Sequence, residues 1–313
     1  MTSGAWALRF ARVGASVLAA LLAVGCVAPG SVRAQEGSVA FEVAAAAEML
    51  ASPDPVVRVA GLCAARELER RAAPLVPTLV GALADDIAMP RMYCRNGRPV
   101  SDVWNDEPTT FGREAAVTLA AIGTPAFVPA VEALDRGDAV TRENAALVLG
   151  ALGTADAVAP LREALDDAEP RVRARAAWGL GAVGDRASVP ALAAATADDD
   201  AEVREQAAWG LGAIGADAGA AHVAGLLDDP SPEVRRQAAW ALGAIGDEGP
   251  VEALLTALRD QDAETREQVA WALGAIGDGR AAAGLAAVLR DADPRVREQA
   301  AWALGAISRD GRR

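Results

Sequence analysis

Lysine is absent from this chain, because all 30 of its basic residues are arginine. This absence excludes a lysine Schiff base and a phosphate-binding loop of the Walker type. Histidine is almost absent too, since His222 is the only one. Histidine metal sites and Ser-His or Cys-His nucleophile pairs would all need that single residue. We therefore expect no catalytic residues, no metal and no cofactor.

Positive charge is also scarce: 43 acidic residues outnumber the basic ones and give a formal net charge of −13. Neutralisation of phosphates supplies most of the affinity for nucleic acid, so an acidic chain is a poor nucleic-acid binder. Runs of β-branched residues are missing, and alanine, leucine and arginine dominate. This composition predicts an all-α fold.

The sequence does contain a strong internal repeat. Tryptophan recurs in near-identical copies of Ala-Trp-(Gly/Ala)-Leu-Gly-Ala-(Val/Ile), each 31 residues after the last. A fixed period of this length indicates stacked supersecondary units rather than one globular core. We expect about eight repeats, including partial ends. The repeated tryptophans are Trp178, Trp209, Trp240, Trp271 and Trp302.

The beginning of the chain has the order of a secretory signal peptide. Arg9 and Arg12 precede the uncharged apolar run Val13–Val24, and small residues at Val32 and Ala34 fit a cleavage site. The run is too short for a comfortable transmembrane helix. We therefore expect residues 1–34 to be removed.

A second interpretation of this segment is a lipoprotein signal. Leu22-Ala23-Val24-Gly25-Cys26 resembles a bacterial lipobox, in which Cys26 would carry a lipid anchor. Both interpretations predict export to the bacterial periplasm or the cell exterior, without a transmembrane helix after processing.

The repeats are expected to form one solenoid over residues 38–308, followed by a polar tail at 309–313. Residues 87–110 are an insertion that breaks the period, which favours a functional or covering role. Its Asn96-Gly97 pair favours a tight turn. Its acidic residues Asp102, Asp106 and Glu107 lack the spacing of a calcium loop, so a solvated acidic turn is favoured.

An arginine recurs at one position of the repeat, and an acidic residue or serine that fits a helix N-cap lies four residues before most of its copies. One interpretation of the arginines is an anion site. The favoured one is a structural ladder, in which each arginine pairs with an N-terminal carboxylate of its own or a neighbouring repeat. The ladder arginines are Arg58, Arg142, Arg173, Arg204, Arg235, Arg266 and Arg297.

Glycines near each tryptophan match the string Gly-x-Gly-x-x-Gly, for example from Gly210 to Gly215. A dinucleotide fingerprint needs a strand before it and a helix after it, whereas this string ends a helix. We predict that Gly215 lies just past the helix C-terminus and that Gly212 permits close helix packing.

The repeated tryptophans lie away from the core stripe of their own helices. At about 100° per residue, Val203, Ala207 and Leu211 share one stripe, and Trp209 lies about 160° from its centre. The tryptophans should therefore form a row on one face. One interpretation is that the row seals the groove between repeats; the other is a surface for a protein or peptide. The partner-binding residues predicted beside the tryptophans are Glu205, Gln206, Glu267 and Glu298.

Cys63 occupies the tryptophan position of the first repeat, and Cys94 lies in the insertion. Exported proteins oxidise such cysteines, so we predict a Cys63–Cys94 disulfide that holds residues 87–110 over the start of the groove. The alternative is that Cys63 is a small buried apolar residue.

The pattern Val-Arg-x-x-Ala-Ala-x-x-Leu-Gly-x-Ile-Gly, seen from Val203 and again from Val234, resembles the HEAT-like repeats first described in phycobilin lyases. The resemblance covers about residues 54–307. It implies antiparallel helix pairs stacked into a superhelical α-solenoid, with the Val-Arg helix lining the inner, partner-binding surface.

Relatives of this kind include lyase subunits, hydroxylases and adaptors. Deoxyhypusine hydroxylase-like proteins hold iron with His-Glu pairs, but Val223 follows His222 here. Bilin lyases act on cytoplasmic proteins, which the export signal argues against. We therefore expect a non-catalytic exported scaffold, and the alternative is a subunit of a lyase-like modifying enzyme.

Overall fold

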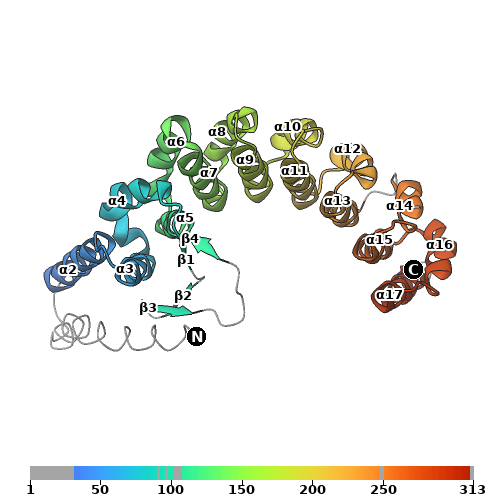
Figure 1. The fold of residues 1–313 in the computed structure, drawn as a ribbon, viewed down its shortest axis with the longest axis horizontal. Helices are drawn as coiled ribbons and strands as arrows, with labels where there is room; N and C mark the ends of the chain where they lie inside the picture. Colours follow the sequence, from blue (N-terminus) through green and yellow to red (C-terminus); the bar gives the residue numbers. More distant parts are fainter. Residues whose placement is uncertain (1–31, 90–91, 96–97, 102–107, 247–249, 311–313) are drawn as a thin grey trace. The chain divides into compact units, whose positions relative to one another are not determined.

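The computed structural model describes residues 32–89, 92–95, 98–101, 108–246 and 250–310. The chain divides into unit 1, Met1–Pro129, and unit 2, Ala130–Arg313. Both units consist mainly of helices (Figure 1), so the predicted all-α solenoid class is confirmed. No helix in the described part of the chain is long and apolar enough to cross a membrane. Residues 1–31, which include most of the predicted signal peptide and Cys26, lie outside the described residues.

Unit 1 holds two long helices that start the array. The helices α2 (Val32–Leu50) and α3 (Pro55–Leu68) pack on each other, and α3 also packs on α5 (Phe111–Ile122). The short α4 (Val76–Gly81) lies between the 3-10 turns η2 (Glu69–Leu75) and η3 (Ala82–Ala84). At the start of α3, Asp54 accepts a hydrogen bond from the Val56 backbone N–H. This is the N-cap that an aspartate before Pro55 favours.

The described residues of the insertion lie mainly in four short strands. The strands β1 (Ala88–Met89) and β4 (Thr109–Thr110) pair antiparallel, as do β2 (Met92–Arg95) and β3 (Arg98–Ser101), with Cys94 opposite Pro99. Helical periodicity stops in this segment, so nothing in the repeat pattern indicated strands. The turn expected at Asn96-Gly97 and the acidic turn at residues 102–107 lie outside the described residues.

Unit 2 alternates long and short helices. After α6 (Phe127–Arg136), the long A helices and the short B helices follow one another along two sides of unit 2 (Figure 1). The A helices are α7 (Ala139–Leu152), α9 (Pro170–Val183), α11 (Ala201–Ile214), α13 (Pro232–Ile245), α15 (Ala263–Ile276) and α17 (Pro294–Asp310). The B helices are α8 (Val158–Glu163), α10 (Val189–Ala195), α12 (Ala220–Gly225), α14 (Val251–Ala257) and α16 (Ala282–Val288).

The helix ends follow from residues that the repeat preserves. Asp200 accepts hydrogen bonds from the backbone N–H groups of Glu202 and Val203 at the start of α11. Gly215 ends the same helix in the left-handed region at φ 64°, which a residue with a Cβ rarely adopts. The predicted position past the helix C-terminus is therefore correct. At the other end of the array, α17 continues to Asp310, two residues into the expected polar tail.

The core of unit 2 lies between the A and B rows. Val203, Ala207 and Leu211 are fully buried, as the predicted core stripe requires. Leu192 on α10 and Val223 on α12, two B helices that contact α11, are fully buried as well. The A helices α9, α11, α13 and α15 each pack between the A helices before and after them. The small residues of the motif let these backbones approach closely. This close stacking fixes the face that the tryptophans share.

Candidate functional site: the tryptophan face

Each repeated tryptophan ring packs on a glycine of the preceding repeat. A Cβ placed on Gly181 would lie 2.8 Å from Cζ3 of Trp209, and one on Gly212 would lie 2.8 Å from Cζ3 of Trp240. Real Cβ atoms do not approach that closely, so only glycine leaves room for the ring. The same contact joins Gly150 to Trp178, Gly243 to Trp271 and Gly274 to Trp302.

The rings therefore close the boundary between repeats, but they are not buried. Trp178, Trp209, Trp240 and Trp271 are each partly exposed, and Trp302 is 45% exposed. The rings of Trp178 and Trp209 are stacked with their centroids 6.2 Å apart. The row thus seals the boundaries between repeats and also lines the surface of the A helices.

Charged side chains accompany the tryptophans at fixed positions. Residues seven and four positions before a tryptophan share its side of the helix, as Glu202 and Glu205 do with Trp209. The sequence-based prediction included Glu205, Glu267 and Glu298 but missed the position seven residues before, although the same spacing rule identifies it. We define the tryptophan face as the repeated tryptophans with Arg171, Glu202, Glu205, Glu233, Arg236, Glu264, Glu267, Arg295 and Glu298.

Ion pairs link neighbouring A helices across much of this face. Arg236 contacts Glu264 on the next helix and lies 3.6 Å from Glu233 on its own. Arg295 lies 3.7 Å from Glu264 and 3.6 Å from Glu267. These residues are half-exposed, so each pair contributes little to stability. They do cancel charge over α13, α15 and α17.

The middle of the face keeps an excess of negative charge. Neither Glu202 nor Glu205 forms an ion pair with a residue in the described part of the chain. Partial burial raises the pKa of Glu205, Glu202 and Glu233 raise it further, and Arg236 opposes them. The carboxylate of Glu205 is therefore held beside Trp209 without enough compensating charge.

Over α9, at the beginning of the face, an arginine lies beside the tryptophan. The Arg175 guanidinium lies 5.8 Å from the Trp178 ring centroid and 3.6 Å from Glu143. The equivalent position in later repeats is glutamine: Gln206, Gln237, Gln268 and Gln299. Gln206, a predicted partner-binding residue, is partly exposed beside Trp209.

The ladder arginines bind within the array. Arg204 donates from Nε and Nη2 to the two carboxylate oxygens of Asp229 at 2.6 and 2.9 Å, and from Nη1 to the Asp198 carbonyl at 2.8 Å. Four further arginines repeat this bidentate bond to an aspartate 25 residues on: Arg142, Arg173, Arg235 and Arg266. The geometry is that of a structural ladder. The carboxylates lie two residues before the N-caps rather than at them.

Ladder pairing shifts both partners toward their charged forms. The hydrogen bond from Arg173 lowers the pKa of Asp198, and the same bond raises the pKa of Arg173. The two ends of the column differ from its middle. Arg58 pairs with Asp85, while Arg297 reaches only the backbone carbonyls of Asp291 and Ala292 within the described residues.

The insertion is fastened to unit 1 by the predicted disulfide. Cys63 and Cys94 are bonded, which confirms that prediction, and Cys63 is 1% exposed. Arg66 lies beside the bond: its Nη1 is 3.6 Å from Cys94 Sγ, and its Nη2 donates to the Glu114 carboxylate at 2.6 Å. The β2–β3 hairpin thus packs on α3, at the helix position that carries tryptophan in unit 2.

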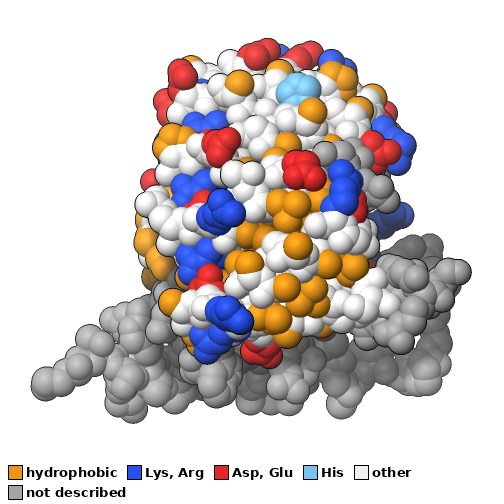
Figure 2. Space-filling model, turned by 90° about the vertical axis from the view of Figure 1, so that its right-hand side faces the viewer, with side chains coloured by type: hydrophobic (Ala, Val, Ile, Leu, Met, Phe, Trp, Pro, Cys, Tyr) orange, Lys and Arg blue, Asp and Glu red, His pale blue; other side chains and the backbone are white. Residues whose placement is uncertain are grey.

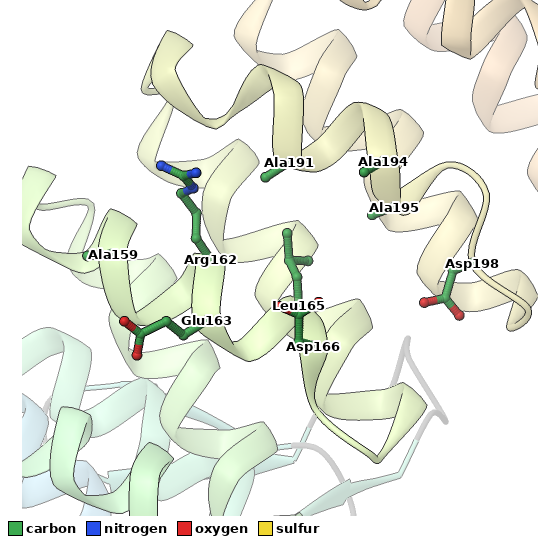
Figure 3. Close-up of a pocket in the computed structure, with 9 residues that line it drawn as sticks. All are labelled: Ala159, Arg162, Glu163, Leu165, Asp166, Ala191, Ala194, Ala195 and Asp198. Atoms are coloured by element: carbon green, nitrogen blue, oxygen red, sulfur yellow. The ribbon is translucent and has the colours of Figure 1, made fainter.

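A hollow of about 540 Å³ lies on the B side of unit 2, between α8 and α10 (Figure 3). It exists because α10 presents only alanines there, Ala191, Ala194 and Ala195. Of its charged residues, Asp198 is already bound to Arg173. His222 is exposed on α12, and the described residues contain no cluster of His, Cys, Asp and Glu that could hold a metal ion.

Comparison with known proteins agrees with this architecture. HEAT repeats match residues 128–212, 158–229 and 220–305. No curated protein matches the sequence. The structure of Escherichia coli YibA is 17% identical over 91% of this chain and 99% of its own, with a TM-score of 0.56. An engineered protein is 22% identical over 89% and 82%, with a TM-score of 0.47. Human deoxyhypusine hydroxylase is 21% identical over 88% and 99%, with a TM-score of 0.38.

The likeness to YibA shows the fold alone. The family match covers more than half of the chain, in the same A and B helices that carry the tryptophan row and the arginine ladder. The chain belongs to the family of HEAT-repeat proteins.

Proposed function

We propose that this chain is an exported, non-catalytic scaffold that binds a protein or peptide on its tryptophan face. The observation that carries the proposal is the regular row of partly exposed indole rings on the A helices. Tryptophan is the residue most enriched among the anchors of protein interfaces. HEAT repeats expose such helix rows as extended binding surfaces.

The glycine seats also support binding, because they fix each ring before a partner arrives. Immobilising a free side chain on binding costs about 0.5–1.5 kcal/mol. A ring that is already wedged against Gly181 or Gly212 avoids most of this cost. Glu205, Gln206, Glu267 and Glu298 then supply the polar surroundings of the row.

The experiment is a pull-down from the exported proteome, followed by affinity measurements with single tryptophan variants. We expect Trp209→Ala or Trp240→Ala to weaken binding of the recovered partner at least tenfold. Because an alanine also opens the repeat boundary, Trp→Phe variants serve as a second set that keeps a ring. Full affinity in all five Trp→Ala variants would rule the proposal out.

Export and anchoring are part of the same proposal. Residues 1–34 act as a signal peptide, or Cys26 carries a lipid after cleavage before it, and the solenoid of residues 38–308 is the mature scaffold. Intact mass of the protein recovered from a secreting bacterial host separates the two. A chain starting at Gln35 supports the first route, a lipidated Cys26 supports the second, and an uncleaved Met1 contradicts both.

The finer assignment to the phycobilin-lyase type of repeat rests on the Val203-Arg204 and Val234-Arg235 motifs. Its enzymatic counterpart, a lyase-like subunit, would cradle a chromophore. An absorption spectrum of the purified protein distinguishes the two roles: a colourless protein supports the scaffold, and a bound bilin supports the enzyme subunit.

A further inference from the structure

We infer that the centre of the tryptophan face, over α11 and α13, takes an arginine-bearing segment of the partner. This inference rests on the proposed function, because it specifies the partner of the same surface. It follows from the uneven charge of the face and from the contact of the Arg175 guanidinium with the Trp178 ring.

The first step is the charge balance along the A helices. Arg175 with Arg171 accompanies Glu143, and Arg295 with Arg236 accompanies the glutamates of α15. Between these two zones, α11 presents Glu202 and Glu205 on the side of Trp209, without an ion pair to a described residue. Glu233 on α13 adds to this negative charge and shares Arg236 with Glu264. A partner that supplies positive charge here is complementary to the face.

The second step is the geometry around Trp178. There the chain places its own guanidinium, that of Arg175, above the indole ring and beside the Glu143 carboxylate. The repeat that carries Trp240 keeps the ring, and Glu205 on the preceding helix stands at the position equivalent to Glu143, but Gln237 replaces the arginine. Trp240 therefore offers the surroundings of the Arg175–Trp178 contact without its cation, and Trp209 with Glu202 and Glu205 lies beside it on α11. A guanidinium from a partner would fill that position.

The third step is the spacing of the rings. Packed helices lie about 8–10 Å apart, so the tryptophans of α11 and α13 are separated by a similar step. A segment in the polyproline II conformation rises about 3.1 Å per residue with three residues per turn, so every third side chain returns to the same side at about that interval. A segment with arginine at every third position therefore matches α11 and α13 together.

Arginine fits better than lysine for a chemical reason. Its planar guanidinium stacks on an aromatic ring and donates a two-pronged hydrogen bond to a carboxylate, whereas a lysine ammonium is a more strongly hydrated point charge. A site made of an indole ring beside a half-buried carboxylate uses both properties.

The test uses the full chain and a fluorescein-labelled peptide of sequence Arg-Ala-Ala-Arg-Ala-Ala-Arg, with lysine and glutamine versions as comparisons. Binding is followed by fluorescence anisotropy at an ionic strength of about 0.1 M, where charges beyond about 10 Å are screened. The variant is E202Q/E205Q, which removes two carboxylates from the face. Its control is E163Q/E252Q, which removes two exposed carboxylates from the B helices α8 and α14.

We expect the arginine peptide to bind more tightly than the lysine and glutamine versions. Its affinity should fall about tenfold in E202Q/E205Q and less than twofold in E163Q/E252Q, a difference of about 1.4 kcal/mol per tenfold step. Equal losses in the two variants would show a general attraction to an acidic chain and overturn the inference. So would the absence of measurable binding of the arginine peptide.

The two proposals fail separately. If the partner recovered by pull-down depends on Trp209 and Trp240 but binds E202Q/E205Q at full affinity, the tryptophan face remains the binding surface and the arginine inference is wrong. If the partner is indifferent to every tryptophan variant, the proposed function itself is wrong.

Discussion

At the scale of single residues, the boundaries between repeats in unit 2 depend on the close fit between a glycine and the tryptophan ring of the next repeat. A Cβ on Gly212 would lie 2.8 Å from Cζ3 of Trp240 and 2.8 Å from the Ala241 Cα. Because one neighbour is backbone and the other is a ring packed between two helices, neither can move aside for a Cβ without a cost in stability. Gly212→Ala should cost about 1–3 kcal/mol, as overpacked cores do.

The matched control for that substitution is Gly305, the same motif position in α17. An added Cβ meets nothing within 4 Å there. Alanine is a better helix former than glycine by up to about 1 kcal/mol, so Gly305→Ala should be neutral or stabilising. Thermal unfolding of both variants checks the pair, and an equal loss in both would contradict the fitted contact.

The arginine ladder gives a second comparison between equivalent residues. The side chains of Arg235 and Asp260 are 7% and 9% exposed and share a bidentate bond. Arg235→Ala leaves the carboxylate of Asp260 enclosed without its partner, which should cost about 3 kcal/mol. Arg297 lacks a described carboxylate partner, so Arg297→Ala should cost less than about 1 kcal/mol. Urea unfolding of the two variants measures the difference, and similar losses would argue against the ladder.

The repeat pattern predicted the ladder arginines but not the aspartates that pair with them. The N-caps could be predicted because a cap interacts with residues next to it in the sequence: Asp200 accepts hydrogen bonds from the backbone N–H groups of Glu202 and Val203. Asp229, by contrast, pairs with Arg204 across a repeat boundary, so this ion pair depends on how two repeats stack. Periodicity likewise placed Trp209 on a shared face but could not show that its ring rests on Gly181, since the contact joins two helices.

At the scale of elements, the ladder makes the stacking of A helices dependent on pH. Arg173 lowers the pKa of Asp198 below its ordinary 3.8, and Arg266 does the same for Asp291. An acid with a depressed folded pKa binds protons more readily when unfolded, so its contribution is present above pH 4 and is lost as the pH falls through the folded pKa. Thermal unfolding from pH 7 to pH 3 should show stability falling steeply only below about pH 4. Asp198→Asn should weaken that dependence; an unchanged pH profile would argue against the linkage.

The insertion is an element that the repeat pattern could locate but not describe. The break in the 31-residue period predicted the limits of the insertion, and the positions of Cys63 and Cys94 predicted the disulfide that attaches it. Its strands were missed, since Thr109 and Thr110 pair with Ala88 and Met89 across the whole insertion. Short strands with so few residues carry too little alternation to be recognised.

The disulfide should stabilise unit 1 selectively. It closes a loop with a sequence separation of 31, which corresponds to about 3.7 kcal/mol in the chain-entropy account. Reduction should therefore lower the unfolding temperature of unit 1 and leave that of unit 2 unchanged. Calorimetry with and without dithiothreitol measures this, and Cys94→Ser is the control that reductant should not affect. Two free thiols at Cys63 and Cys94 under denaturing, non-reducing conditions would contradict the bond.

At the scale of the whole array, stability should vary along unit 2, because each repeat is stabilised by its neighbours. The helix α11 packs between α9 and α13, whereas α17 packs on α15 and has no second A helix beside it in the described structure. Apolar side chains gather at this end (Figure 2), where Trp302 is 45% exposed and Leu289 40% exposed.

Local opening in repeat arrays follows the number of packed neighbours, so amide hydrogen exchange should be slowest in α11 and fastest in α17. Exchange measured by mass spectrometry on the intact protein tests this order. Trp302→Ala should speed exchange in α15 and α17, because the ring closes the boundary at Gly274, and should leave α11 unchanged. Equal protection in α11 and α17, or a change that spreads to α11, would mean that unit 2 opens as one cooperative block rather than repeat by repeat.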